Sequence, residues 1–278
     1  MSMFLQTIVD VLVVAMPLFY GVVVFLYARS FFTGNSAAER WKSPVLKMTV
    51  ILHLVYILAR TAAFDHPPIT TVYEIMTILA ACIAVGYLYI EVRTHARNTG
   101  FFILLLAFVF QLASSLFIKD LVEIDPVLRS RLLGFHVSAT LLGYTGISLS
   151  AAYGFLYLML YHEIKSSRFG IIYQRLPNLE MLETMSTNSE FFGFLTLSVG
   201  IAIGFFWLPL AFDNVSYWDP KLIGTLFIWV LYLIGIVAKR RFGLQGRKMM
   251  IVSLVGFGFV FLSMTLINFG LSGFHKFH

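Results

Sequence analysis

The sequence predicts an all-α, polytopic membrane protein that crosses the bilayer about eight times as a single domain over residues 1–278. Of the 278 residues, 59% are hydrophobic and 12% are charged, and the mean hydropathy of +0.85 lies outside the range of soluble domains. Apolar runs of about 20 residues, enough to cross roughly 30 Å of hydrocarbon, recur along the chain. Because lipid offers no partners to backbone amides, these runs must form helices.

Eight apolar runs give the predicted membrane helices in order, with mostly short polar loops between them. We expect the first run to be a retained helix, because no Lys or Arg precedes it and Asp10 lies in its first half, unlike a cleavable signal. The third run contains Cys82, the only cysteine, which excludes an internal disulfide and a CxxCH site for covalent haem. The longest inner connection, 162–190, contains the Pro177 break. The eight runs are residues 5–27, 45–62, 72–90, 101–118, 132–161, 191–212, 222–238 and 249–269.

The distribution of basic residues predicts the orientation in the membrane. Most of the 20 Lys and Arg residues fall in alternate loops. By the positive-inside rule these loops face the cytoplasm, so both termini lie on the outer, periplasmic or extracellular, side. The net charge of +6 is thus an orientation signal, and we expect a multi-pass protein of the cell inner (plasma) membrane without a nucleic-acid partner. The inner residues are Arg29, Arg40, Lys42, Lys47, Arg93, Arg97, Lys165, Arg168, Arg175, Lys239, Arg240, Arg241, Arg247 and Lys248.

Histidines are the residues most suggestive of chemistry, because neutral imidazole is a usual axial ligand of haem iron. Four of the seven gather at the predicted outer face, and His136 lies about 7 Å inside the fifth helix at 1.5 Å per residue. Polar groups in hydrocarbon are costly, which favours a functional role for His136 and less firmly for His53, near the middle of the second helix. The outer four are His66, His136, His275 and His278; His95 and His162 lie at inner helix ends.

Small residues recur along the fifth helix at positions 139, 143, 146, 150 and 154. They permit close approach of another helix, which is the ordinary interpretation, or they leave a slot for a flat ligand.

The loop before the seventh helix offers a second half of a haem site. Tyr217 and Trp218 present flat faces for stacking on a porphyrin, while Asp219 and Lys221 can meet charged groups. Pro220 is expected to start the helix, whose N-terminus adds positive potential suited to propionates. The alternative is that the aromatics are interfacial anchors and that Asp219 is only a cap.

Three stretches resemble the cytochrome c assembly protein family of the CcsA, CcmC and HemX type, whose members are integral membrane haem handlers. The stretches are HPPITTVYE, GFHVSATLLGYTG, and YWDPKLIG followed by NFGLSGFHKFH, and the resemblance is strongest over residues 60–278. It implies His136 and His275 as the axial ligands of a non-covalent haem b, with Trp218 and Asp219 in the haem-facing loop. His278 remains an alternative to His275, and His53 and His66 remain further candidates.

The WDPKLIG form and the inner segment RRFGLQGRK resemble the HemX-like branch more closely, and the chain departs from the pattern of full haem-transfer members. Leu222 and Gly224 stand where full haem-transfer members have Glu and Trp, Ser216 stands where another Trp is expected, and Val237 replaces a histidine.

We therefore expect a component of cytochrome c biogenesis that holds or presents haem at the outer face, without a reaction of its own. A second membrane protein of the assembly pathway or apocytochrome c is the expected partner. The alternative is a HemX-like regulator of the level of glutamyl-tRNA reductase, a cytosolic partner that would meet the inner loop with Glu180, Glu183 and Glu190. A transporter using Asp10, Glu74 and Gln111 as a proton path is disfavoured, because no inverted repeat is found.

Overall fold

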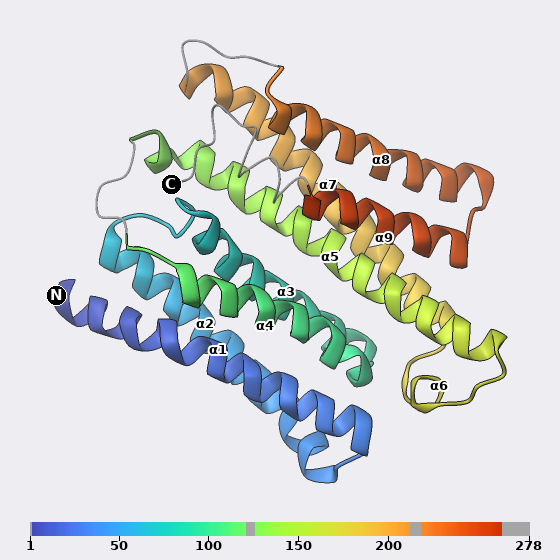
Figure 1. Ribbon diagram of the computed structural model, residues 1–278. Helices are drawn as coiled ribbons and strands as arrows, with labels where there is room; N and C mark the ends of the chain where they lie inside the picture. Colours follow the sequence, from blue (N-terminus) through green and yellow to red (C-terminus); the bar gives the residue numbers. More distant parts are fainter. Residues whose placement is uncertain (1, 121–125, 212–217, 263–278) are drawn as a thin grey trace. The chain divides into compact units, whose positions relative to one another are not determined.

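The computed structural model describes residues 2–120, 126–211 and 218–262, and over these residues the regular structure is entirely helical, with no strand (Figure 1). Seven of the described helices are long and apolar enough to cross a membrane. These helices confirm the predicted all-α, polytopic class.

The chain divides into two compact units, Met1–Ser130 and Arg131–His278. Each unit has its own helices, and a single domain over residues 1–278 stays a prediction. The first unit contains α1 (Ser2–Thr33), α2 (Ser36–Phe64), α3 (Val72–Thr94), η1 (Arg97–Thr99), α4 (Gly100–Phe117) and η2 (Pro126–Arg129). The second contains α5 (Arg131–Lys165), α6 (Ile171–Arg175), α7 (Leu179–Ala211), α8 (Pro220–Phe242) and α9 (Arg247–Leu262).

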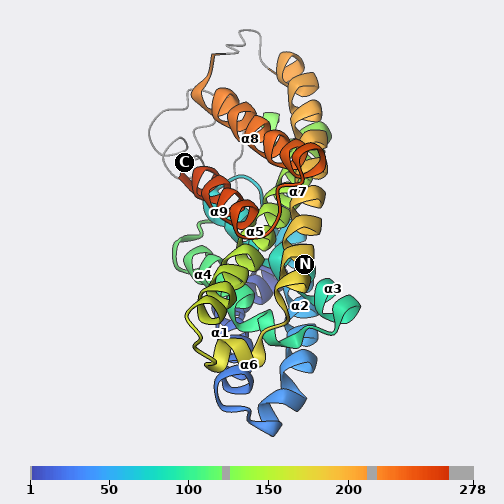
Figure 2. The same ribbon diagram turned by 90° about the vertical axis from the view of Figure 1, so that its right-hand side faces the viewer.

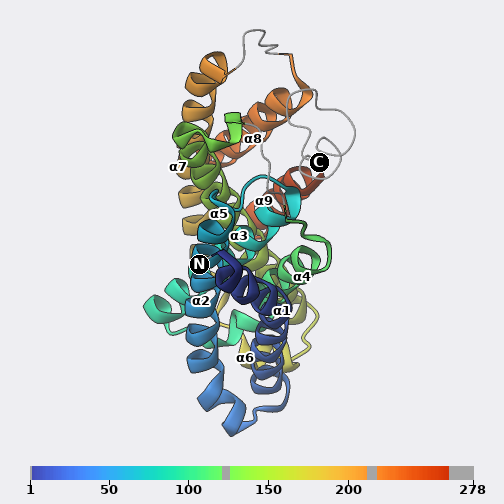
Figure 3. The same ribbon diagram turned by 90° about the vertical axis from the view of Figure 1, so that its left-hand side faces the viewer.

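A tight turn joins the first two helices. Gly34 has a positive φ of 64°, which glycine adopts without a steric penalty. Asn35 then caps α2, its side chain accepting a 2.9 Å hydrogen bond from the Ala38 amide. Because the turn is so short, α1 and α2 form the long antiparallel hairpin whose connection lies at the bottom of Figure 3.

A buried lysine joins two connections at one end of the first unit. Lys42 is 1% exposed, lies 2.8 Å from the Glu39 carboxylate and donates at 3.3 Å to the backbone oxygen of Arg97. The α1–α2 and α3–α4 connections therefore share one end of this unit. The positive-inside rule requires the same grouping, since both connections are rich in basic residues.

The second unit is built on the antiparallel pair α5 and α7, against which α8 and α9 pack (Figures 1 and 2). Its apolar core takes residues from all four helices: Ile147, Leu197, Ile228, Tyr232 and Val260. The α8–α9 connection meets the first turns of α7, because the Gly246 amide donates at 2.8 Å to the Glu183 carboxylate. Hence the α5–α7 and α8–α9 connections share one end of this unit.

The structure corrects the predicted helix bounds. Helices α1 and α2 start earlier and end later than the predicted spans 5–27 and 45–62, because polar residues extend a helix beyond the hydrocarbon without breaking it. The predicted loop 162–190 contains the short α6, which was missed. The eighth predicted span, 249–269, corresponds to α9 over its described part, and residues 263–269 lie outside the described residues.

Candidate functional site

His136 lies in the second turn of α5, half-buried, and α7 fixes its ring. Its Nδ1 is 2.7 Å from the backbone oxygen of Gly200. A carbonyl oxygen only accepts, so Nδ1 carries the proton and donates. The lone pair of the neutral ring is then on Nε2. Histidine ligands of metals commonly have this arrangement, in which the second ring nitrogen donates to a carbonyl or carboxylate.

Two glycines of α7 let α5 approach around His136, and the sequence analysis missed both. A Cβ added to Gly204 would lie 2.7 Å from the His136 ring, and one added to Gly200 would lie 2.6 Å from the Thr140 hydroxyl oxygen. Gly193, Gly200 and Gly204 are spaced by seven and four residues, which places them on one helix face. That spacing is the signal that points to these residues.

The small residues of α5 serve helix packing. Gly143 approaches Leu197, Gly146 meets the backbone of Gly193, and a Cβ at Gly146 would lie 2.6 Å from it. Farther along α5, the Ser150 hydroxyl is 2.8 Å from that of Ser253 on α9. The structure therefore confirms close helix approach at positions 143, 146 and 150 and leaves no slot for a flat ligand there.

The loop before α8 is described from Trp218 onward. Trp218 is 84% exposed, whereas Asp219 is 5% exposed. The Asp219 backbone oxygen accepts from the Ile223 amide at 3.1 Å, so α8 begins at Pro220 as predicted. Lys221 lies in the first turn of α8. Tyr217, His275 and His278 lie outside the described residues.

His136 and the Trp218–Asp219 pair occupy the same end of the second unit. His136 packs against Gly200 and Gly204, in the last turns of α7, and α7 leads directly into the connection to α8. This end is opposite the one that holds the basic α5–α7 and α8–α9 connections. The two described parts of the predicted site therefore lie at the same end of the second unit.

His66 belongs to the first unit and is 3% exposed. Its Nδ1 donates at 3.0 Å to the backbone oxygen of Pro67, which again places the lone pair on Nε2. The segment that carries it is held by Glu74, whose carboxylate accepts from the Thr70 amide at 2.9 Å and from the Thr70 hydroxyl at 2.6 Å.

A buried ion pair anchors the Glu74 carboxylate in turn. Arg60, 1% exposed, lies 3.0 Å from Glu74 and 3.0 Å from Asp120. The same Arg60 donates at 3.2 Å to the backbone oxygen of Lys119. With these partners, Glu74 is committed to holding the α2–α3 connection, which leaves it poorly suited to a proton path.

His53 lies inside the first unit within a continuous line of polar groups. Its Nδ1 is 2.9 Å from the Tyr20 hydroxyl and its Nε2 is 2.9 Å from the Thr77 hydroxyl. Thr77 donates its proton to Gln111 at 2.7 Å, so it accepts from Nε2 of His53, and Tyr20 donates to Nδ1. Both ring nitrogens are thus engaged, which argues against His53 as an iron ligand.

The carboxylates of the predicted inner connection are largely used within the second unit. Glu183 accepts from the Gly246 amide and lies 3.8 Å from Lys239, and Glu190 is 2% exposed. Only Glu180 of the three is exposed. This leaves a small acidic surface for a cytosolic partner.

Comparisons with known proteins agree on one family. The sequence profile described as "Cytochrome C assembly protein" matches residues 69–275. The chain is 23% identical over 273 residues to "Cytochrome c biogenesis protein CcsA" of Mesostigma viride, covering 90% of both chains. It is 27% identical over 268 residues to the protein of that name from Prochlorococcus marinus (strain MIT 9301), covering 87% of this chain and 85% of the relative. A similar protein of Heterosigma akashiwo (strain NIES-293 / 8280G21-1) is 25% identical over 281 residues.

Proposed function

Because the chain belongs to the cytochrome c assembly protein family, we propose that it binds haem b non-covalently through His136 and presents it at the outer membrane face during cytochrome c biogenesis. The chain is a multi-pass membrane protein with a role in cytochrome c biogenesis, as its family and its apolar helices indicate.

The hydrogen bond between His136 and Gly200 is the observation that carries the proposal. It fixes the orientation of the ring and places the lone pair of the neutral imidazole on Nε2. Such a bond to a backbone oxygen raises the basicity of the ligand nitrogen and removes rotational freedom before iron binds. This arrangement of the ring supports His136 as the proposed ligand.

The remaining residues of the proposed site have defined tasks. His275 supplies the second axial imidazole, with His278 as the alternative, and His66 is a further outer-face candidate. Exposed Trp218 and neighbouring Tyr217 stack on the porphyrin face. Lys221 and the α8 N-terminus meet the propionates, and buried Asp219 holds the loop at that helix start.

The partner is proposed from the chemistry of the chain. Cys82, the only cysteine, cannot form the thioether pair of a covalent CxxCH haem site. The haem must therefore pass to a second polypeptide, such as another membrane protein of the assembly pathway or apocytochrome c. In this proposal the chain carries out no reaction of its own. It ligates, orients and releases haem in the plasma membrane.

Haem titration of the detergent-purified full-length chain tests the proposal. The wild-type protein should give a low-spin, bis-histidine absorption spectrum. His136→Ala should lose it, and added imidazole should restore low-spin character by entering the vacated space. His162→Ala is the matched control, because it changes the same helix about 39 Å away at 1.5 Å per residue. An unchanged spectrum in His136→Ala, or an equal loss in His162→Ala, contradicts the proposal.

The HemX-like regulatory function has less support in the second unit. It requires a surface for a cytosolic enzyme on the inner connection, where Glu183 and Glu190 are used in contacts within the second unit.

A further inference from the structure

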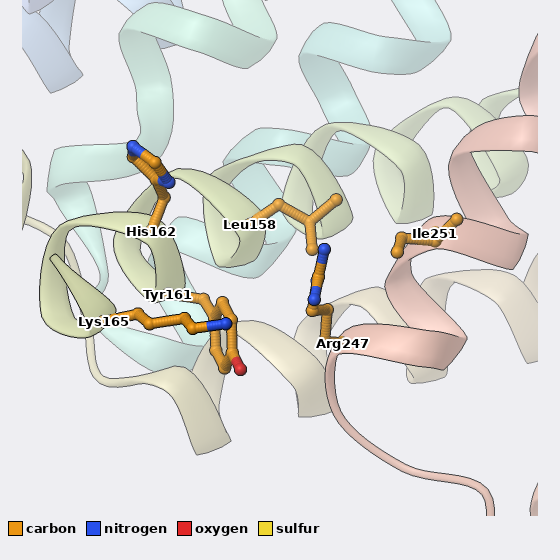
Figure 4. A pocket seen from close by; sticks show the side chains of 6 residues that line it. All are labelled: Leu158, Tyr161, His162, Lys165, Arg247 and Ile251. Atoms are coloured by element: carbon orange, nitrogen blue, oxygen red, sulfur yellow. The ribbon is translucent and has the colours of Figure 1, made fainter.

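A cavity of about 270 Å³ opens between the last turns of α5 and the first turns of α9, at the end of the second unit opposite His136. Figure 4 shows the side chains that line it, with Arg247 extending from the start of α9 and Lys165 passing the ring of Tyr161. The lining residues are Leu158, Tyr161, His162, Lys165, Arg247 and Ile251.

The cavity carries positive charge that no carboxylate of the described residues neutralises. The ion pairs of the described chain involve Lys42, Arg60 and Lys239, and neither Lys165 nor Arg247 has an acidic group within 4.0 Å. Arg247 lies instead over the ring of Tyr161, 5.7 Å from its centroid. The cavity therefore suits an anion.

Glu163, the acidic residue of α5, makes its contact away from the cavity. The Glu163 carboxylate accepts from the Tyr173 amide at 2.8 Å and so holds the first turn of α6. That contact holds the Glu163 charge at the connection to α6, and the Glu163 side chain does not line the cavity.

The lining is polarised along the two helices, with charged residues at their ends and apolar residues farther in, as an amphiphile requires. Lys165 is the last residue of α5 and Arg247 the first of α9, so both charges lie at the helix ends. Leu158 lies about 10 Å and Ile251 about 6 Å farther in, at 1.5 Å per residue. A ligand that fits has an anionic head at the mouth and an apolar part pointing into the bilayer.

The volume of the cavity limits which anionic amphiphiles can bind in it. Its volume is slightly below the roughly 300 Å³ at which pockets for drug-sized molecules begin. A phosphate headgroup fits that space, with its acyl chains leaving along the apolar side chains. A rigid porphyrin macrocycle does not. Basic pockets between membrane helices on the cytoplasmic side are a known mode of anionic lipid recognition.

We propose that this cavity binds the headgroup of an anionic phospholipid of the inner leaflet. Lys165 and Arg247 hold the phosphate, His162 adds a third nitrogen at the mouth, and Leu158 and Ile251 receive the first part of the acyl chains. The lipid links α5 to α9 at the end where the two helices leave the membrane. The inference is independent of haem binding at His136.

Native mass spectrometry of the full-length protein in detergent, titrated with phosphatidylglycerol or phosphatidylcholine, tests this assignment. The wild-type chain should retain phosphatidylglycerol in preference to phosphatidylcholine. Each basic residue near an anionic headgroup contributes about fivefold to binding, so the Lys165→Gln/Arg247→Gln double variant should bind phosphatidylglycerol about 25-fold more weakly. The matched control is Arg168→Gln/Lys248→Gln, which removes the same charge from neighbouring residues outside the cavity. Its affinity should stay within twofold of wild type.

Three kinds of outcome overturn the assignment. The first is an equal loss in the control pair or equal binding of the two lipids, either of which makes the interaction a diffuse surface effect. The second is displacement of the bound lipid by millimolar inorganic phosphate, which makes the site one for a soluble anion. The third is a changed haem spectrum in the cavity double variant with lipid binding unchanged, which makes the cavity part of a haem path.

Discussion

At the scale of the residue, the account depends on one imidazole and the helix that holds it. The sequence pointed to His136 through its position inside a membrane helix, but it could not tell which ring nitrogen carries the proton. That choice is made by the Gly200 oxygen, 64 residues away in the chain, and becomes visible only once α5 and α7 are packed together.

Gly204→Ala tests how closely α7 fixes the ring. The added methyl group would lie 2.7 Å from Cε1 and Nδ1 of His136, so the ring must move away from the Gly200 oxygen. Losing one hydrogen bond costs about 1 kcal/mol, which predicts haem binding about fivefold weaker, measured by titration in detergent.

The matched control for this variant is Gly134→Ala. Gly134 lies two residues before His136, and an added Cβ meets nothing within 4 Å. Haem affinity should therefore stay at the wild-type value. If the Gly204 and Gly134 variants bind haem equally well, α7 does not position the ligand.

At the scale of the element, most of the helices followed from the apolar runs, because backbone groups in lipid have no alternative to the helix. Their ends did not follow, because polar residues such as Arg40 and Lys42 continue α2 outside the apolar stretch. The small-residue pattern of α5 could not be assigned from the sequence either, since both a packed helix and a bound ligand require small residues. The contact between Gly146 and Gly193 shows that the small residues there serve helix packing.

Gly146→Ala tests the close approach of α5 and α7. The new methyl group would lie 2.6 Å from the Gly193 backbone, which cannot move aside as a flexible side chain does. Overpacking of this kind costs about 1–3 kcal/mol, and each kcal/mol lowers the melting temperature by about 2–4 °C in a chain of this size. Thermal unfolding in detergent should therefore show a melting temperature lowered by several degrees.

Gly258→Ala provides the comparison, since its added Cβ meets nothing within 4 Å on α9. We expect its melting temperature to match the wild type. Equal melting temperatures for all three proteins would mean that the two helices do not depend on this contact.

At the scale of the whole molecule, the sequence predicted the class of protein but not its division into two compact units. Composition and repeated apolar runs established a polytopic membrane protein. The two compact units were not predicted, because membrane helices look alike in composition whichever neighbours they choose. The orientation, with both termini outside, and the pairing of His136 with His275 stay predictions.

The part of the chain that matches the family includes the described residues of both proposed sites. Residues 69–275 cover the whole of α3 and α4 and the second unit through α9. Within that stretch, one end of the second unit carries His136 with Trp218 and Asp219, and the other carries the basic cavity. The two proposed sites therefore lie at opposite ends of the same four helices.

An experimental structure of the haem-loaded protein tests the central claim most directly, through the atom of His136 that meets the iron. We predict ligation through Nε2, with Nδ1 still donating to the Gly200 backbone oxygen. Ligation through Nδ1, or an iron atom held away from residue 136 altogether, would contradict the account.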